Sequence, residues 1–486
     1  MSTPSIVIIG TGFGGLGMAM ELQNAGMFDF TILERSDEVG GVWRENTYPG
    51  AGCDIPSPLY SYSYAPRADW PKRFSQQADI LQYLRDIARD HGLLPKIRFD
   101  SEVTEAEYDD ATGRWTVHTA DGAELHCDVL ISAVGQLSRP ALPGIPGVET
   151  FQGIAFHSAE WDHEADLTGK RVAVIGTGAS AVQFVPAIAP STEHLTLFQR
   201  SAAWIMPKPD KEYKSWHKTM FKQLPFTRLT ERFAFWAFCE FLALGIVDVP
   251  AIQKLVTGIG HRHLKNQVPD PQLRAALTPD DPAGCKRTLF SNEYLSSLTA
   301  ANVTVETTAI TEITPEGVRT ADGVLHEVDA IVYSTGFKGA EFLWPMQISG
   351  SGGRKLHDDW GAEGARAYRG MTVPGYPNMF MLYGPNTNLG VGSVVYMIES
   401  QARYIRQALH TLSENPGRVL DVRREAEADF DKNLQSRLDR SPWVFCSSWY
   451  RNAAGRITNN WPGTVASYRW QTRKFDPADF ELKTVS

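Results

Sequence analysis

Residues 6–34 read IVIIGTGFGGLGMAMELQNAGMFDFTILE, and residues 172–200 read VAVIGTGASAVQFVPAIAPSTEHLTLFQR. The two stretches align without a gap at an offset of 166 residues, and both contain IGTG. Each begins with a short apolar run, which is typical of a buried parallel strand, and continues through a glycine turn, a helical stretch and a second apolar run. The repeat therefore predicts an α/β protein with two Rossmann-like dinucleotide-binding domains.

The glycine turn of each repeat has the composition of a phosphate-binding loop. In the first repeat, Gly10 permits a tight turn, Gly12 lets the backbone approach a pyrophosphate, and Gly15 allows the helix to pack closely on the strand. The helix that follows such a turn directs unpaired N–H groups at the phosphates. In the second turn Gly176 and Gly178 correspond to Gly10 and Gly12, and Ala181 replaces the third glycine, which is a tolerated variant. Ser180 of this turn is also expected to contact the cofactor.

The residue that ends the second apolar run differs between the repeats. The first repeat has Glu34, and a carboxylate at this position accepts hydrogen bonds from a ribose diol. The second repeat has Arg200 followed by Ser201, and a guanidinium at this position pairs with a 2′-phosphate that a carboxylate would repel. The first repeat is therefore expected to bind FAD and the second to bind NADPH.

The repeats divide the chain into parts. Residues 1–145 are expected to form the N-terminal part of the FAD-binding domain, 146–168 a linker, and 169–337 the NADPH-binding domain. Residues 338–486 are expected to return to the FAD-binding domain. A segment rich in Trp, Phe and Leu, at about 205–280, predicts a helical insertion in the NADPH-binding domain.

Composition narrows the class of protein. The net charge of −9 argues against nucleic acid or an anionic membrane as the main partner. The five cysteines are odd in number and contain no CxxC, which argues against a disulfide framework, a structural zinc site and a disulfide reductase. No metal site is expected.

Targeting and membrane signals are weak. The apolar run at residues 5–9 follows Met-Ser-Thr-Pro with no basic segment before it, so a cytoplasmic location is expected. The longest apolar stretch, 233–249, contains two acidic residues and is shorter than the ~18–20 residues of a membrane span. It predicts a buried helix in preference to a peripheral membrane contact, and no transmembrane segment.

Two further motifs carry a resemblance to a known family. Residues 151–162 read FQGIAFHSAEWD and match FxGxxxHxxxWD at every defined position: Phe151, Gly153, His157, Trp161 and Asp162. Residues 40–54 read GGVWRENTYPGAGCD, with Trp43 in a Gly-Gly-x-Trp stretch and Asp54 at the end. With these motifs the chain resembles the type I Baeyer–Villiger monooxygenases, the family of phenylacetone and cyclohexanone monooxygenases, over nearly its whole length.

The resemblance implies an activity and a set of catalytic residues. Members of this family use FAD, NADPH and O2 to convert ketones to esters or lactones through a flavin C4a-peroxide. The active-site arginine of the family corresponds to Arg287, and the carboxylate beside it corresponds to Asp54. An arginine suits this role because it keeps its positive charge and can hold two oxygens.

The resemblance also implies cofactor contacts and a role for the linker. Trp43 is expected near FAD, Lys286 is expected to join Arg200 and Ser201 around the 2′-phosphate, and Trp449 to lie on the nicotinamide side. His157 is expected to act in domain coupling or as a hinge, although its ordinary pKa would suit a general base.

The sequence leaves three alternative functions open. A flavin-containing N- or S-oxygenating monooxygenase would use the same cofactors on amines or sulfides. An uncoupled NADPH oxidase would release hydrogen peroxide. A non-catalytic FAD/NADPH redox sensor would bind both cofactors and signal through a partner. The identity of the ketone and the oligomeric state cannot be predicted from the sequence.

Overall fold

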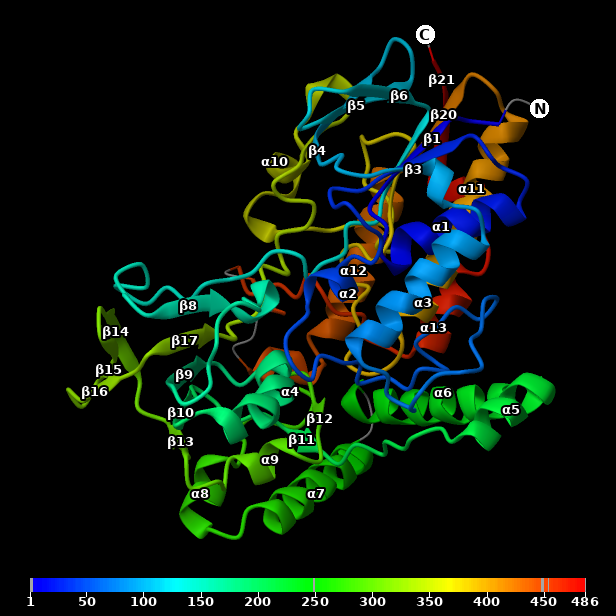
Figure 1. Cartoon of the computed structure of the whole chain (residues 1–486). Coiled ribbons are helices and arrows are strands. Elements are labelled where there is room, and N and C mark those ends of the chain that lie inside the picture. The colour runs from blue at the N-terminus through cyan, green and yellow to red at the C-terminus, as the bar shows by residue number, and fades with distance from the viewer. Residues whose placement is uncertain (1–2, 248–249, 447–449, 453, 486) are drawn as a thin grey trace.

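Two parallel five-stranded sheets form the framework of the molecule (Figure 1). The computed structural model describes residues 3–247, 250–446, 450–452 and 454–485. The first sheet has the order β19-β7-β1-β2-β3 and the second the order β13-β10-β9-β17-β8, with every neighbouring pair parallel. The first contains β1 (Ile6–Ile9), β2 (Phe30–Leu33), β3 (Ile97–Arg98), β7 (Val129–Ser132) and β19 (Met379–Met381). The second contains β8 (Ile154–His157), β9 (Arg171–Ile175), β10 (His194–Phe198), β13 (Val303–Glu306) and β17 (Ala330–Tyr333).

The two sheets are built to one plan, which confirms the predicted α/β class with two Rossmann-like domains. In each sheet the first strand of the repeat is central, the second strand of the repeat lies on one side of it, and a later strand, β7 or β17, lies on the other. Strands β1, β7 and β17 are buried along their whole length, as expected of strands covered on both faces. Helices α1 (Phe13–Asn24) and α4 (Ala179–Ile188) follow the glycine turns directly.

Glycine is required in the turns for two separate reasons. Gly10 and Gly176 have φ of +100° and +108°, a region that favours glycine. They also lie against backbone: a Cβ on Gly176 would be 2.4 Å from the carbonyl oxygen of Ser334. A Cβ on Gly15 would be 1.8 Å from the carbonyl oxygen of Gly10, so α1 can start this close to β1 only without a side chain.

A small antiparallel sheet is attached to each domain. In the first domain β4 (Val103–Asp109), β5 (Arg114–Thr119) and β6 (Glu124–Cys127) form a meander, joined by β18 (Gln347–Ser349). In the second domain the strands are β14 (Ile310–Thr314), β15 (Gly317–Thr320) and β16 (Leu325–Glu327).

The C-terminal third contributes elements to the first domain. Strand β19 completes the first sheet, and α11 (Val394–Glu414) packs on α1. Both marked chain ends lie at the same end of the molecule (Figure 1). The remaining elements of this part are α10 (Leu356–Trp360), β20 (Arg418–Val422), α12 (Arg424–Leu438), α13 (Val465–Thr472) and β21 (Phe480–Thr484), and α2 (Val42–Glu45) and α3 (Gln77–Asp90) belong to the N-terminal part.

The expected linker differs from the structure. Residues 154–157, expected in a connecting segment, form β8 and pair in parallel with β17 as the edge strand of the second sheet. The motif therefore lies within a sheet at this point, because its alternating apolar residues complete the edge next to β17.

The insertion is helical after a short extended start. Strand β11 (Ile205–Met206) pairs with β12 (Leu289–Phe290), and the helices in between form the lowest layer of Figure 1. These helices are α5 (Ser215–Gln223), α6 (Pro225–Val247), α7 (Pro250–Gln267) and α8 (Pro271–Ala276), and α9 (Tyr294–Ser297) follows β12. The insertion also contacts the first domain: the Glu240 carboxylate accepts the backbone N–H groups of Val465 and Ala466 at the start of α13, at 3.0 and 3.1 Å.

We expect Gly15→Ala to lower the FAD content of the purified protein by at least about tenfold, because the new Cβ would push α1 away from the turn that receives the pyrophosphate. FAD absorbance per polypeptide measures this. The control is Gly258→Ala in α7, where a Cβ meets nothing within 4 Å. That change should leave FAD content intact, and it removes the cost of about 1 kcal/mol of a helical glycine. Normal FAD content in Gly15→Ala would contradict the prediction.

Candidate active site

The FAD-side turn and its acidic residue are held together. Glu34 lies at the end of β2 with 6% of its surface exposed. Its Oε2 accepts the backbone N–H and the hydroxyl of Thr11, at 2.9 and 2.5 Å, and its Oε1 accepts the N–H of Ser36 at 3.0 Å. Thr11 stands between the first two glycines of the turn, so the carboxylate and the phosphate-binding backbone form one rigid unit.

The Gly-Gly-x-Trp motif packs against the same turn. A Cβ on Gly41 would be 3.1 Å from the Cα of Gly12, so two glycine backbones meet there. Trp43, in α2, donates its indole N–H to the hydroxyl of Tyr60 at 3.2 Å and stays partly exposed. The cradle of side-chain-free backbone, flanked by an aromatic ring and a buried acid, fits a dinucleotide such as FAD.

The second turn is flanked by cationic and hydroxyl groups. Lys286 Nζ donates to Ser201 Oγ at 2.9 Å and forms an ion pair with Asp281 at 2.6 Å. Arg200 is exposed and makes no ion pair with any residue that the structure describes. The structure thus brings Ser201 and Lys286 together next to the turn at Gly176.

The carboxylate of Asp54 pairs with a lysine that the sequence motifs did not identify. Lys208 Nζ lies 3.2 Å from Asp54 Oδ1, and only 8% of the Asp54 side chain and 18% of the Lys208 side chain are exposed. The backbone of Lys208 is fixed by Asn292, which accepts its N–H at 2.9 Å and donates to its carbonyl at 2.8 Å. The ammonium group also lies 5.1 Å from the ring centroid of Phe74.

Arg287 approaches the same carboxylate without a direct ion pair. Burial lowers the pKa of the guanidinium, and the Asp54 carboxylate raises it, with the net result above the ordinary value. Arg287 is nevertheless exposed to solvent. Its guanidinium is therefore surrounded by protein but still accessible to solvent. Within the part of the chain that the structure describes, its guanidinium makes no hydrogen bond or ion pair, which leaves its donors available to a ligand.

Lys208 and Arg287 flank the two-stranded β-ribbon that β11 and β12 form. Lys208 follows β11 by two residues and Arg287 precedes β12 by two residues, and β11 and β12 are paired in parallel. The two cations therefore approach Asp54 from opposite ends of the ribbon. No sequence spacing reveals this pairing; the only local signal is a lysine two residues after a buried apolar pair.

A glutamine of the second domain fixes the segment that leads to Asp54. Gln183, in α4, accepts the hydroxyl of Tyr48 at 3.0 Å and the N–H of Gly52 at 3.1 Å, and donates to the carbonyl of Gly52 at 2.9 Å. A Cβ on Gly50 would be 2.6 Å from the Gln183 carbonyl oxygen. The sequence analysis missed Gln183, although it lies three residues past Ser180 in the second turn motif.

The residues of the FxGxxxHxxxWD motif lie in the second sheet and its surroundings. His157 ends β8 with 3% of its surface exposed, its Nδ1 accepts the N–H of Ala159 at 3.1 Å, and burial lowers its pKa. Trp161 packs edge-on against Phe156 and against Phe184. The environment of His157 favours a neutral, structural imidazole.

The remaining residues of the motif, Gly153, Asp162 and Phe151, make structural contacts. A Cβ on Gly153 would be 2.5 Å from the carbonyl oxygen of Asp329, and the Asp162 carboxylate accepts the N–H of Glu164 at 3.0 Å. Phe151 packs on the core that contains Ile313 and Ile331.

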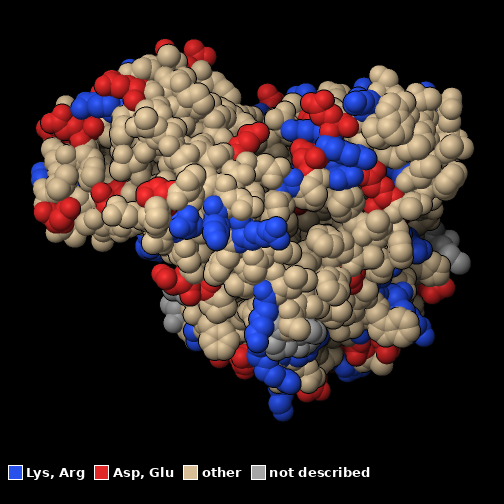
Figure 2. All heavy atoms as spheres, turned by 90° about the horizontal axis from the view of Figure 1, so that it is seen from below, with Lys and Arg blue, Asp and Glu red and all other residues tan. Residues whose placement is uncertain are grey.

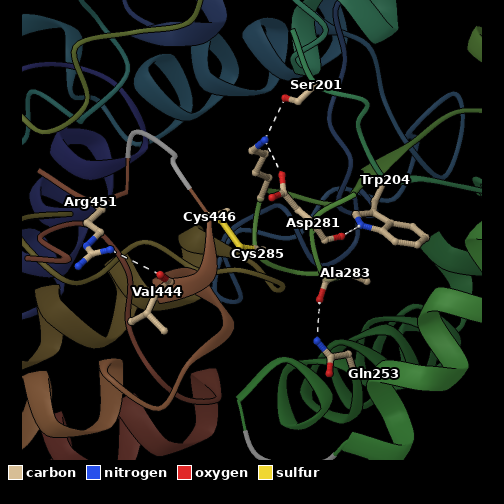
Figure 3. Close-up of a disulfide and its surroundings, with 10 residues drawn as sticks. Ser201, Trp204, Gln253, Asp281, Ala283, Cys285, Val444, Cys446 and Arg451 are labelled. Atoms are coloured by element: carbon tan, nitrogen blue, oxygen red, sulfur yellow. Dashed lines mark hydrogen bonds and ion pairs between the residues drawn. A yellow bond between two sulfur atoms is a disulfide. The ribbon is translucent and has the colours of Figure 1, made fainter. Parts of the chain in front are cut away.

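Cys285 and Cys446 form a disulfide, which corrects the expectation from cysteine count (Figure 3). The bond joins residues 161 apart in sequence, so spacing alone could not predict it. It ties the segment that carries Lys286 and Arg287 to the C-terminal segment at 441–446. The same segment is held by Trp204, which donates to the Asp281 carbonyl at 2.8 Å, and by Gln253 of α7, which donates to the Ala283 carbonyl at 3.4 Å (Figure 3).

Three further observations concern Trp449, metal binding and membrane spans. Trp449 lies outside the described residues. Among the residues that the structure does describe, no group of three or more His, Cys, Asp or Glu side chains could hold a metal ion. The helices within the described ranges are all too short or too polar to cross a membrane.

Comparison with known proteins places this site in a family. The model of the flavin-binding monooxygenase-like family matches residues 3–348. A Baeyer–Villiger monooxygenase of Streptomyces coelicolor is 43% identical over 480 residues, covering 98% of this chain and 92% of that protein. An oxidised steroid monooxygenase bound to NADP superposes with a TM-score of 0.88 at 30% identity, over 100% of both chains. A structure of OTEMO in complex with FAD and NADP gives a TM-score of 0.87 at 28% identity, over 99% of this chain and 100% of that one.

The chain belongs to the flavin-binding monooxygenase-like family. Within this family it is a Baeyer–Villiger monooxygenase, an oxidoreductase that depends on FAD and NADPH. The predicted family, enzyme class and cofactors are confirmed.

We expect three of the five cysteines to react with N-ethylmaleimide in the unfolded, unreduced protein, because Cys53, Cys127 and Cys239 are free. All five should react after reduction, and mass spectrometry of the labelled chain measures both numbers. Five labels without reductant would contradict the disulfide. A Cys446→Ser variant should then show four labels under both conditions.

We expect Lys208→Met to lower NADPH-dependent oxygenation about tenfold, equivalent to ~1.4 kcal/mol, because Asp54 would then pair with Arg287 and neutralise it. Lys208→Arg should keep most of the activity. The matched control is Lys211→Met, an exposed lysine on the same segment with the same change of charge. Equal loss in both methionine variants would show that the effect comes from the segment's net charge and not from Asp54.

Proposed function

We propose that this enzyme inserts one atom of O2 beside the carbonyl of a ketone, forming an ester or lactone, with Arg287 as the fixed positive charge at the reacting oxygen. The second oxygen atom leaves as water, and NADPH supplies the two electrons. The observation that carries the proposal is the solvent-accessible guanidinium of Arg287 near Asp54, which makes no hydrogen bond or ion pair with the described residues. Arg287 also follows Lys286, the residue that reaches the second dinucleotide turn.

The glycine turns and their flanking residues bind the cofactors in this proposal. The turn at Gly10, with Glu34 on the ribose, binds FAD, and Trp43 lies beside it. The turn at Gly176 binds NADPH. Its 2′-phosphate is held by three groups, namely Arg200, Ser201 and Lys286. When bound, FAD takes a hydride from NADPH and activates O2, and this chemistry belongs to the cofactor.

Arg287 stabilises negative charge at the reaction centre. Addition to a carbonyl places negative charge on the carbonyl oxygen, and a preorganised cation beside that oxygen lowers the energy of that state. The guanidinium is suited to this because it holds two oxygens and does not lose its proton. Asp54 orients Arg287 and offsets the cost of its burial, and Lys208 keeps Asp54 from neutralising it. None of the three transfers a proton.

The FxGxxxHxxxWD segment couples the cofactor domains in this proposal. It contributes β8 to the second sheet, and Trp161 extends from it to Phe184, which in turn contacts Tyr48 of the first domain. A buried neutral His157 away from Asp54 supports a coupling role rather than proton transfer. A cytoplasmic location is proposed because NADPH is the electron donor.

The FAD-loaded enzyme, incubated with NADPH, O2 and a panel of cyclic, aromatic and linear ketones, should give products one oxygen heavier than the ketone, identified by mass spectrometry. Arg287→Ala should lower product formation about 10²–10³-fold, because a transition-state charge loses its partner. FAD content should stay unchanged, since Arg287 is not part of the first turn.

Two further variants are part of the test: Arg287→Lys, which keeps the charge, and Arg440→Ala, which is the control. A lysine keeps the charge but not the two-oxygen geometry, so activity should lie between the wild type and Arg287→Ala. Arg440 is exposed and far from both turns in sequence, and its loss should have no effect. Oxidation of amines or sulfides alone would favour an N- or S-oxygenating enzyme, and hydrogen peroxide alone would favour an uncoupled oxidase.

A further inference from the structure

Exposed apolar side chains are concentrated on the helical insertion. Of the 17 large hydrophobic side chains that are exposed in the described residues, ten lie on or beside α5, α6 and α7. Phe226 and Phe233 of α6 are 63% and 64% exposed. We call this surface the apolar helical face. Its members are Trp216, Leu224, Phe226, Leu229, Phe233, Phe238, Phe241, Leu244, Leu255 and Ile259. So many exposed apolar side chains on neighbouring helices are uncommon on a protein that has no partner there.

Helix α6 is apolar on two sides, and protein covers only one of them. Cys239 and Ala243 are buried against the body of the molecule, at 7% and 6% exposure. Glu240 binds the start of α13, and Arg232 donates to the carbonyl oxygens of Pro58 and Ser61. The exposed phenylalanines and leucines recur on the other side at spacings of three to five residues. A helix that is apolar all round needs an apolar environment on both sides.

The insertion is basic although the chain is acidic. Residues 211–267 contain nine Lys and Arg against four Asp and Glu, whereas the whole chain has a net charge of −9. Two of the acids point inward: Glu231 binds Arg73 and Tyr213, and Glu240 binds α13.

Six of the nine basic side chains are exposed at the surface. Lys214, Lys218 and Lys222 follow one side of α5 at intervals of four residues, and Lys214 and Lys222 are exposed. Lys254, Lys265 and Arg262 of α7 are exposed as well. Figure 2 views the molecule from the side of α5, α6 and α7, and uncharged residues make up most of this side, with lysine and arginine side chains among them.

We propose that the apolar helical face binds the surface of an anionic lipid bilayer. The aromatic and aliphatic side chains of α5–α7 would enter the boundary between head groups and acyl chains, with the helices lying in the plane of the surface. The surrounding lysines and arginines are attracted by anionic head groups. A second copy of the chain is a poorer partner, because two basic faces would repel each other.

The test is sedimentation of the FAD-loaded enzyme with vesicles of phosphatidylcholine alone or mixed with phosphatidylglycerol. The enzyme should sediment with the anionic vesicles and much less with the neutral ones, and high salt should weaken binding because it screens the surface charges. Phe226→Ser/Phe233→Ser/Phe241→Ser should lower the partition coefficient at least about tenfold, since each buried aromatic contributes to insertion.

Two further variants separate the apolar and electrostatic contributions from misfolding. Lys214→Gln/Lys218→Gln/Lys222→Gln should lower binding to anionic vesicles and bring it near the level on neutral ones. Leu142→Ser/Trp470→Ser removes two exposed apolar side chains outside the insertion and should bind like the wild type. FAD absorbance and NADPH oxidation report folding for every variant.

Several results would overturn the proposal. These are absence of sedimentation with anionic vesicles, equal binding by the Leu142/Trp470 and Phe226/Phe233/Phe241 variants, and a wild-type dimer in velocity sedimentation that the Phe226/Phe233/Phe241 changes dissociate. The last result would assign the apolar helical face to a second copy of the chain.

Discussion

The carboxylate of Asp54 is the charge on which the arrangement of this site depends. An ionised carboxylate with 8% of its side chain exposed is stable only with compensating charge nearby. Asp54 belongs to the first domain, whereas both cations near it, Lys208 and Arg287, belong to the second. The compensation therefore exists only when the two domains are in contact, and assembly of the active site is tied electrostatically to the interface.

The interface is also held by uncharged and covalent contacts. Gln183 makes three hydrogen bonds to Tyr48 and Gly52, just ahead of Asp54. The insertion reaches the first domain through Glu240, and the Cys285–Cys446 disulfide ties the arginine segment to the C-terminal part. These contacts limit how far the domains can separate during the reaction, and they favour small adjustments over wide opening.

The features that local sequence could predict are those set by short-range chemistry. The repeat of strand, glycine turn and helix predicted both sheets, because steric requirements at Gly10, Gly15 and Gly176 act within a few residues. The contrast of Glu34 with Arg200 predicted two different cofactors, because each of these residues lies in the same strand–turn–helix–strand repeat as its glycine turn. Lys208, Gln183 and the disulfide escaped prediction because each depends on partners more than 100 residues away in sequence. The motif at 151–162 was recognised, but its strand β8 depends on pairing with β17 and was therefore expected as linker.

The segment at 285–287 shows how one short stretch can serve three purposes. Lys286 donates to Ser201 beside the second dinucleotide turn, whereas the next residue, Arg287, interacts electrostatically with Asp54. Cys285 anchors both through the disulfide. A shift of this segment would move Lys286 and Arg287 together. If Lys286 holds the 2′-phosphate and Arg287 the reacting oxygen, as proposed above, binding of the NADPH phosphate would also set the position of the arginine, with no need for a separate signal between the two sites.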